Sequence, residues 1–110
     1  MNVDRLYLVH ILEAIDRIHE DAAEGEHAFF SDRRIQDAII RNLAVVGEAV
    51  KSLSTELREA KPEVPWKAIA GMRDRLIHGY FGIDLQLVFK VVERDIPLLE
   101  STIRRLLEEL

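Results

Sequence analysis

Residues 84–107, DLQLVFKVVERDIPLLESTIRRLL, decide the fold class of this chain. Their apolar side chains recur three or four positions apart, the spacing that places residues on one face of an α-helix. Asp84 is a suitable N-cap, and Pro97 is predicted to kink or split the helix. The apolar positions are Leu85, Val88, Val91, Val92, Ile96, Leu99, Ile103, Leu106 and Leu107. They exceed what one partner helix can cover, so we expect part of this surface to pack against a second copy of the chain.

The same spacing continues toward the N-terminus. A first helix is expected from Asp4, its N-cap, to about residue 23, and a second from a cap at Ser31 or Asp32 to about Leu53. Ser54 is predicted to start a short helical turn that ends near residue 60.

Pro65 suits the first turn of a third main helix, and Gly79 is a typical C-terminal cap for it. No window alternates with the two-residue period of a strand. The sequence therefore predicts one all-α domain over residues 1–110, an up-and-down bundle of four to five helices.

Composition narrows the class of protein. The chain has 110 residues, no cysteine and a net charge of −5. Disulfides and thiolate chemistry are excluded, and an extended nucleic-acid coat is disfavoured. The first residues lack a signal-peptide pattern and no apolar run is long enough for a bilayer, so we expect a cytoplasmic protein. Between residues 65 and 82, three basic side chains face one acidic one, which favours a small phosphate site.

The stretch from Arg73 to Tyr80, RDRLIHGY, concentrates residues that can do chemistry. An arginine can clamp a phosphate with its planar fork of donors, and a histidine such as His78 can transfer a proton near neutral pH. Asp74, four residues before His78, shares its helix face and can orient the imidazole. Taken singly, each residue also fits a solvated cation, a helix-end histidine or an aromatic at the edge of the core. Their combination favours function.

The spacing of the two catalytic candidates has a consequence for assembly. Residues five apart, such as Arg73 and His78, are separated by about 140° around a helix and do not share a face. A two-fold dimer would bring the histidine of one copy to the arginine of the other. We therefore expect a homodimer in which the two segments face each other.

The order of motifs resembles the HEPN family, in particular the HepT-like toxins paired with minimal nucleotidyltransferase antitoxins. The matching pieces are Gly47-Glu48-Ala49, Pro65-Trp66, the R-x4-H-x-Y stretch of residues 73–80, and Ile83-Asp84. A polar residue, often asparagine, follows the motif arginine in this family, and here the residue is Asp74. The resemblance implies a HEPN-like helical bundle and a metal-independent endoribonuclease, with no cofactor.

Roles for single residues follow from the resemblance. His78 would activate the ribose 2′-hydroxyl or protonate the leaving oxygen, Arg73 would stabilise charge on the phosphoryl group, and Asp74 would orient His78. The product would carry a 2′,3′-cyclic phosphate. The antitoxin would transfer AMP from ATP to Tyr80 and so silence the toxin. Glu48 and Arg75 are supporting residues, Glu48 by orienting the arginine.

A rival interpretation is a non-catalytic helical module that binds a nucleotide or accompanies a nucleotidyltransferase. In that case Arg73 would bind phosphate without turnover. The pair Glu24 and His27 has the spacing of a di-iron ligand motif but occurs once, beside Gly25. His27 is therefore interpreted as a surface loop residue, and Gly47 as a site of close helix packing.

Overall fold

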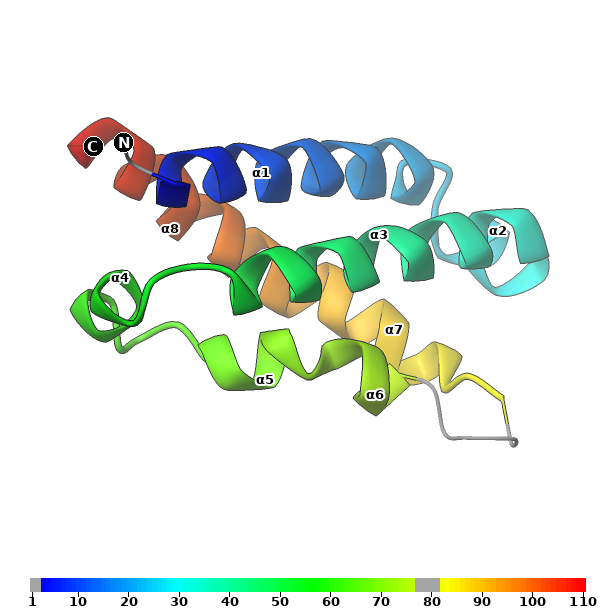
Figure 1. Ribbon diagram of the computed structural model, residues 1–110. Helices are drawn as coiled ribbons and strands as arrows, with labels where there is room; N and C mark the ends of the chain where they lie inside the picture. Colours follow the sequence, from blue (N-terminus) through cyan, green and yellow to red (C-terminus); the bar gives the residue numbers. More distant parts are fainter. Residues whose placement is uncertain (1–2, 77–81) are drawn as a thin grey trace.

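The computed structural model describes residues 3–76 and 82–110, and these form a helical bundle (Figure 1). Two long helices, α1 (Val3–Ala22) and α3 (Arg33–Lys51), run side by side. The remaining elements are α2 (Glu26–Ser31), α4 (Thr55–Ala60), α5 (Trp66–Ala70), α6 (Met72–Leu76), α7 (Leu85–Lys90), a π-helical turn η2 (Val91–Asp95) and α8 (Ile96–Glu109). None of the described residues belongs to a strand. The predicted all-α bundle is confirmed.

The core lies between α1, α3 and the final helical segment. α3 contacts α1 on one side and α5 and α6 on the other, and α8 crosses behind α1 (Figure 1). Each fully buried aliphatic side chain contributes roughly 1.5–3 kcal/mol of transfer free energy. Among the described apolar residues, those without solvent exposure are Leu8, Ile11, Ala14, Ile15 and Ile18 of α1, Leu43, Val46 and Val50 of α3, Val88 of α7 and Ile103 of α8. The helical spacing in the sequence thus identified most of the core, but Leu6 and Val9, which continue the same pattern on the first helix, are 53% and 37% exposed.

Three predicted N-caps are present. The side chain of Asp32 accepts the backbone N–H of Arg34 at 2.9 Å, and that of Asp84 accepts the N–H of Leu87 at 3.1 Å. Ser54 accepts the N–H of Leu57 at 3.2 Å. Each of these bonds satisfies an N–H that has no partner within its helix.

Asp4 was predicted as the cap of the first helix, and this is wrong. α1 already begins at Val3, and the carboxylate of Asp4 accepts two hydrogen bonds from Ser54, from its backbone N–H at 2.8 Å and its hydroxyl at 2.6 Å. Asp4 therefore ties the start of α1 to the start of α4, 50 residues away in sequence.

The interpretation of His27 as a loop residue is also wrong. Gly25 adopts a φ of +99° and ends the turn after α1, and a short helix, α2, begins directly after it. His27 lies in this helix, exposed, while Phe29 of the same helix is buried. One buried aromatic per turn was too weak a periodic signal to predict the element.

The predicted third main helix is divided. α5 ends at Ala70 and α6 begins at Met72, with Gly71 between them. The predicted end at Gly79 lies outside the described residues.

The final helix is interrupted just before Pro97, as predicted. The N–H of Ile96 reaches the carbonyl of Val91 five residues back, which defines the π turn. Proline has no N–H to offer to the carbonyl four residues earlier, so the wider turn relieves the mismatch at this point.

The expected apolar surplus of the final helix is not present. Every apolar residue used to predict this helix is buried or partly buried within one chain. α8 packs against α1 and α7 against α6, and of this pattern Leu85 and Leu107 alone keep partial exposure. The large exposed apolar side chains lie mainly elsewhere: Val3, Leu6, Val9, Val45, Ile83, Leu98 and Leu110.

Candidate active site

The helix that carries the motif arginine, α6, is held firmly to the bundle. Its first and last residues, Met72 and Leu76, are both 1% exposed. The carbonyl of Leu76 accepts the backbone N–H of Asp84 at 3.3 Å. This bond joins the last residue of α6 to the residue just before α7, so the described chain on the two sides of residues 77–81 is held at one place on the core.

A close approach of α3 to α5 positions this support. A Cβ built on Gly47 would lie 3.1 Å from the carbonyl oxygen of Ile69 and 3.4 Å from that of Ala70. A side chain at this position would be tightly confined, in keeping with the interpretation of Gly47 as a site of close helix packing. Trp66 at the start of α5 is buried, and its indole N–H donates to the carbonyl of Lys61 at 2.9 Å.

The predicted site residues fall into two groups. Asp74 and Arg75 lie on α6 with exposed side chains, and the guanidinium of Arg75 reaches the carbonyl of Ala68 at 3.5 Å. The side chain of Arg73, together with His78 and Tyr80, lies outside the described residues. The arrangement of Arg73, His78 and Tyr80 therefore remains a prediction.

Glu48 lies on α3, where it is exposed and 3.4 Å from the ammonium of Lys51. It lines a groove between α1 and α3 with a volume of about 760 Å³. Its proposed contact with the arginine remains a prediction.

The groove was not predicted from the sequence. Apolar side chains form part of its lining, including Tyr7, Ile40, Ala44 and Val45, and charged residues of both helices surround them. A signal was available at Val45, which lies outside the apolar pattern used to predict its helix, lines the groove and is 41% exposed.

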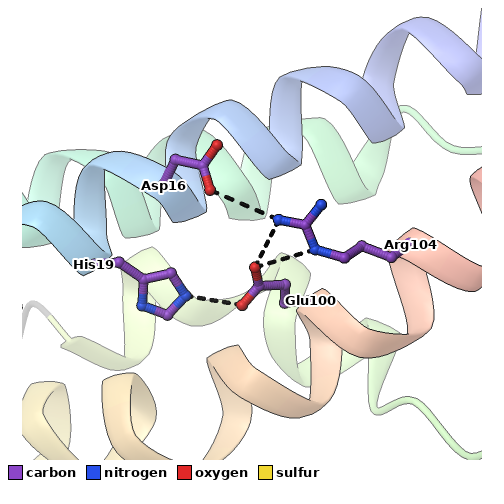
Figure 2. Close-up of polar contacts among 4 residues, drawn as sticks. All are labelled: Asp16, His19, Glu100 and Arg104. Carbon is purple, nitrogen blue, oxygen red and sulfur yellow. Dashed lines mark hydrogen bonds and ion pairs between the residues drawn. The ribbon is translucent and has the colours of Figure 1, made fainter.

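A polar cluster joins α1 to α8 away from this groove (Figure 2). His19 Nε2 lies 2.8 Å from one carboxylate oxygen of Glu100, and Arg104 Nη2 lies 2.9 Å from the other. Asp16 approaches the same guanidinium at 3.9 Å. The hydrogen bond with His19 lowers the pKa of Glu100, burial opposes this, and Arg104 lowers it further. These four side chains, which we call the clasp, link α1 to α8, and each contacts another member of the group.

No group of three or more histidine or acidic side chains within residues 3–76 and 82–110 is arranged to hold a metal ion. The described helices also include none long and apolar enough to cross a membrane.

The structure is thus that of a small helical protein in which the charged residues Asp74 and Arg75 of α6 are exposed beside a buried core. The model of the family described as "Ribonuclease HepT-like" matches residues 11–106. The chain therefore belongs to the HepT-like ribonuclease family. This confirms the family and the class of enzyme, a ribonuclease, that the motifs predicted.

Individual relatives agree. The chain is 40% identical over 113 residues to a "Putative RNase" of Caldanaerobacter subterraneus, covering 99% of this chain and 98% of the relative. It is 42% identical over 101 residues to a "Probable ribonuclease HepT" of Thermococcus cleftensis, covering 91% and 92%. No solved structure matches the chain.

A third relative is longer. The chain is 47% identical over 107 residues to a "Gamma-glutamylcyclotransferase and putative RNase" of Methanocaldococcus jannaschii. The match covers 96% of this chain and 48% of the relative, so the chain spans about half the length of that protein.

Proposed function

We propose that this protein is a toxin that cleaves RNA without a metal ion, with Arg73 and His78 as its catalytic residues. The observation that carries the proposal is the R-x4-H-x-Y stretch in a chain that belongs to the HepT-like ribonuclease family. The firm anchoring of α6 supports it, because a catalytic group must be held in place by a rigid shell.

The reaction requires one proton transfer at each end of a phosphodiester. His78 takes the proton of the ribose 2′-hydroxyl, the 2′-oxygen attacks phosphorus, and the bond from phosphorus to the 5′-oxygen breaks. The leaving oxygen takes a proton from water and the protonated His78 returns its proton to water, which gives a 5′-hydroxyl and a 2′,3′-cyclic phosphate. Arg73 stabilises the negative charge that develops on the phosphoryl oxygens. Asp74 holds His78 in the productive tautomer.

The proposed regulator is a minimal nucleotidyltransferase antitoxin. It transfers AMP from ATP to the phenol oxygen of Tyr80, which forms a new P–O bond as pyrophosphate leaves and the phenol loses its proton. The added phosphate carries negative charge to the place proposed for the RNA phosphate. Substrate binding is lost for that reason. Intact-mass measurement after co-expression with a nucleotidyltransferase, on wild type and Tyr80→Phe, tests this step.

The proposed assembly is a homodimer in which the two R-x4-H segments face each other. The argument is that residues five apart in a regular helix are separated by about 140°, so one copy of such a helix would not bring Arg73 and His78 to one face. Light scattering at micromolar concentration tests it.

The decisive experiment is an RNA cleavage assay on purified protein. Arg73→Ala and His78→Ala are each expected to lower the rate by roughly 10²–10⁴-fold, the usual contribution of such groups. Arg105→Ala and His27→Ala, which replace exposed residues of α8 and α2, serve as matched controls and should cleave like wild type. Activity should also survive exhaustive chelation. Full cleavage by a folded His78→Ala protein would exclude this mechanism, and absence of cleavage by wild type would favour the non-catalytic binding module.

A further inference from the structure

A pocket of about 350 Å³ lies between the first two turns of α3 and the segment that leads into α7. Its two walls come from the same end of the bundle (Figure 1). The volume falls within the range of small-ligand sites in proteins, about 300–1,000 Å³. The side chains that line this α3–α7 pocket include Arg33, Gln36, Asp37 and Ile40 of α3, and Ile83 and Leu85 on the other wall.

The α3–α7 pocket borders the end of the helix that carries the motif arginine. Ile83 and Leu85 flank Asp84, whose backbone N–H donates to the carbonyl of Leu76 at 3.3 Å. Leu76 is the last residue of α6, and in the sequence the rest of the R-x4-H-x-Y stretch follows it. A ligand in this pocket would therefore lie beside the place where the proposed catalytic stretch leaves α6.

One wall of the pocket suits the flat face of a nucleobase. Ile83 is 39% exposed, and Ile40 and Leu85 keep partial exposure. A base that packs on these aliphatic side chains removes them from water, which provides the hydrophobic part of its affinity.

The α3 wall presents hydrogen-bond acceptors. The side-chain nitrogen of Gln36 donates to the carbonyl of Phe29 at 2.9 Å, so the side-chain oxygen remains to accept a hydrogen bond from a ligand. Asp37 adds a carboxylate, which can only accept when it is ionised. Two acceptors on one wall favour a ligand edge that carries donors, such as the exocyclic amino group of a base.

Arg33 provides the positive charge that a phosphate needs. Its side chain is 90% exposed, and its Nε lies 3.9 Å from the carboxylate of Asp37, whose side chain is 65% exposed. An ion pair this long and this exposed is weak. The guanidinium can therefore turn from Asp37 to a phosphate, with which it makes stronger, bidentate bonds.

We propose that the α3–α7 pocket binds one nucleotide of the RNA substrate and selects a base with an exocyclic amino group. The base packs on Ile83, its amino group donates to Gln36 or Asp37, and Arg33 holds the phosphate. Uracil is disfavoured because it offers a single donor between two carbonyl oxygens, so one of the two protein acceptors would face an oxygen. This role rests on the proposed ribonuclease function, but binding can be measured apart from cleavage.

Short 2′-O-methyl oligonucleotides test the pocket, because they lack the 2′-hydroxyl nucleophile and cannot be cleaved. Cytosine and uracil have nearly the same shape, but one has an amino group where the other has a carbonyl oxygen. In fluorescence anisotropy, wild type is expected to bind an oligocytidylate about 5-fold or more tightly than an oligouridylate of equal length. Asp37→Asn should bind the two with similar affinity, because an amide donates as well as accepts. Arg33→Gln should weaken both equally and reduce the slope of log K against log salt by about 0.7, the effect of one lost phosphate contact.

Controls separate these effects from a change in net charge. Arg34→Gln and Glu20→Gln make charge changes of the same sign at exposed positions outside the lining of the pocket, and both should bind like wild type. Absence of binding by wild type, equal affinity for the two oligonucleotides, or a cytosine preference that survives in Asp37→Asn would each overturn the proposal. RNA cleavage by such a protein would leave the proposed function standing. Base-selective binding by a wild type that does not cleave ordinary RNA would remove the catalytic role and leave the pocket, so the two failures can be told apart.

Discussion

Replacing Gly47 with alanine tests the packing that holds the candidate active site. The new Cβ would lie 3.1 Å from a backbone oxygen of α5, and a backbone atom cannot rotate away as a flexible side chain can. Overpacking of this kind costs about 1–3 kcal/mol. Alanine also stabilises a helix interior by about 0.5–1 kcal/mol relative to glycine. Gly47→Ala is therefore expected to lower the free energy of unfolding by about 0.5–2 kcal/mol.

Gly71 provides a matched control for this substitution. Its φ is −88°, and a Cβ there would lie 3.5 Å from its nearest neighbour, an ordinary contact distance. Gly71→Ala should be neutral or should stabilise the fold by up to about 1 kcal/mol, because it removes freedom from the unfolded chain. Urea unfolding followed by circular dichroism, with equal m-values for all proteins, measures both. A Gly47→Ala protein as stable as Gly71→Ala would show that the close approach of α3 to α5 does not require glycine.

Three further predictions concern stability. Ser54→Ala removes the cap of α4 and its bond to Asp4, so urea unfolding should show a loss of about 1–2 kcal/mol, and an unchanged midpoint would contradict the role of this junction. The folded-state pKa of Glu100 is lowered below its ordinary value of 4.5. The carboxylate thus contributes stability above pH 4.5 that disappears as the pH falls through the lowered pKa. For this partly exposed clasp the contribution is about 1 kcal/mol or less, and it should vanish from the pH profile of Glu100→Gln. Among the described side chains, Thr102 is 1% exposed and its hydroxyl has no hydrogen-bond partner, so Thr102→Val should leave the melting temperature unchanged or raise it, whereas a clear loss would reveal a partner for the hydroxyl.

Local signals in the sequence predicted most of the fold. The caps Asp32, Ser54 and Asp84 were recognisable because each bonds an N–H two or three residues ahead. Helical spacing predicted most of the core because it too is a pattern among residues that are close together in the sequence. Asp4 was misjudged because its partner lies 50 residues away, and no local pattern records such a contact.

The candidate site could be predicted only in part. Asp74 and Arg75 lie exposed on α6 between the buried residues Met72 and Leu76, and their part in the site stays a prediction. The break at Gly71 was missed, since glycine lowers helix stability without defining whether a helix stops. The groove beside α3 depends on which face of α1 meets it, and that is decided by tertiary packing.

The π turn before Pro97 also limits how this protein can change in length. Val91 and Ile96, five residues apart, are both 1% exposed, although such positions differ by about 140° in a regular α-helix. The turn thus holds one residue more than an α-helical path between the same two core contacts would need. Replacing the proline alone would not remove the turn, because straightening the helix with the same residue count would rotate α8 by about 100° against its neighbours. A variant in which the proline is replaced and one residue of the turn is deleted could close the same core with an unbroken final helix.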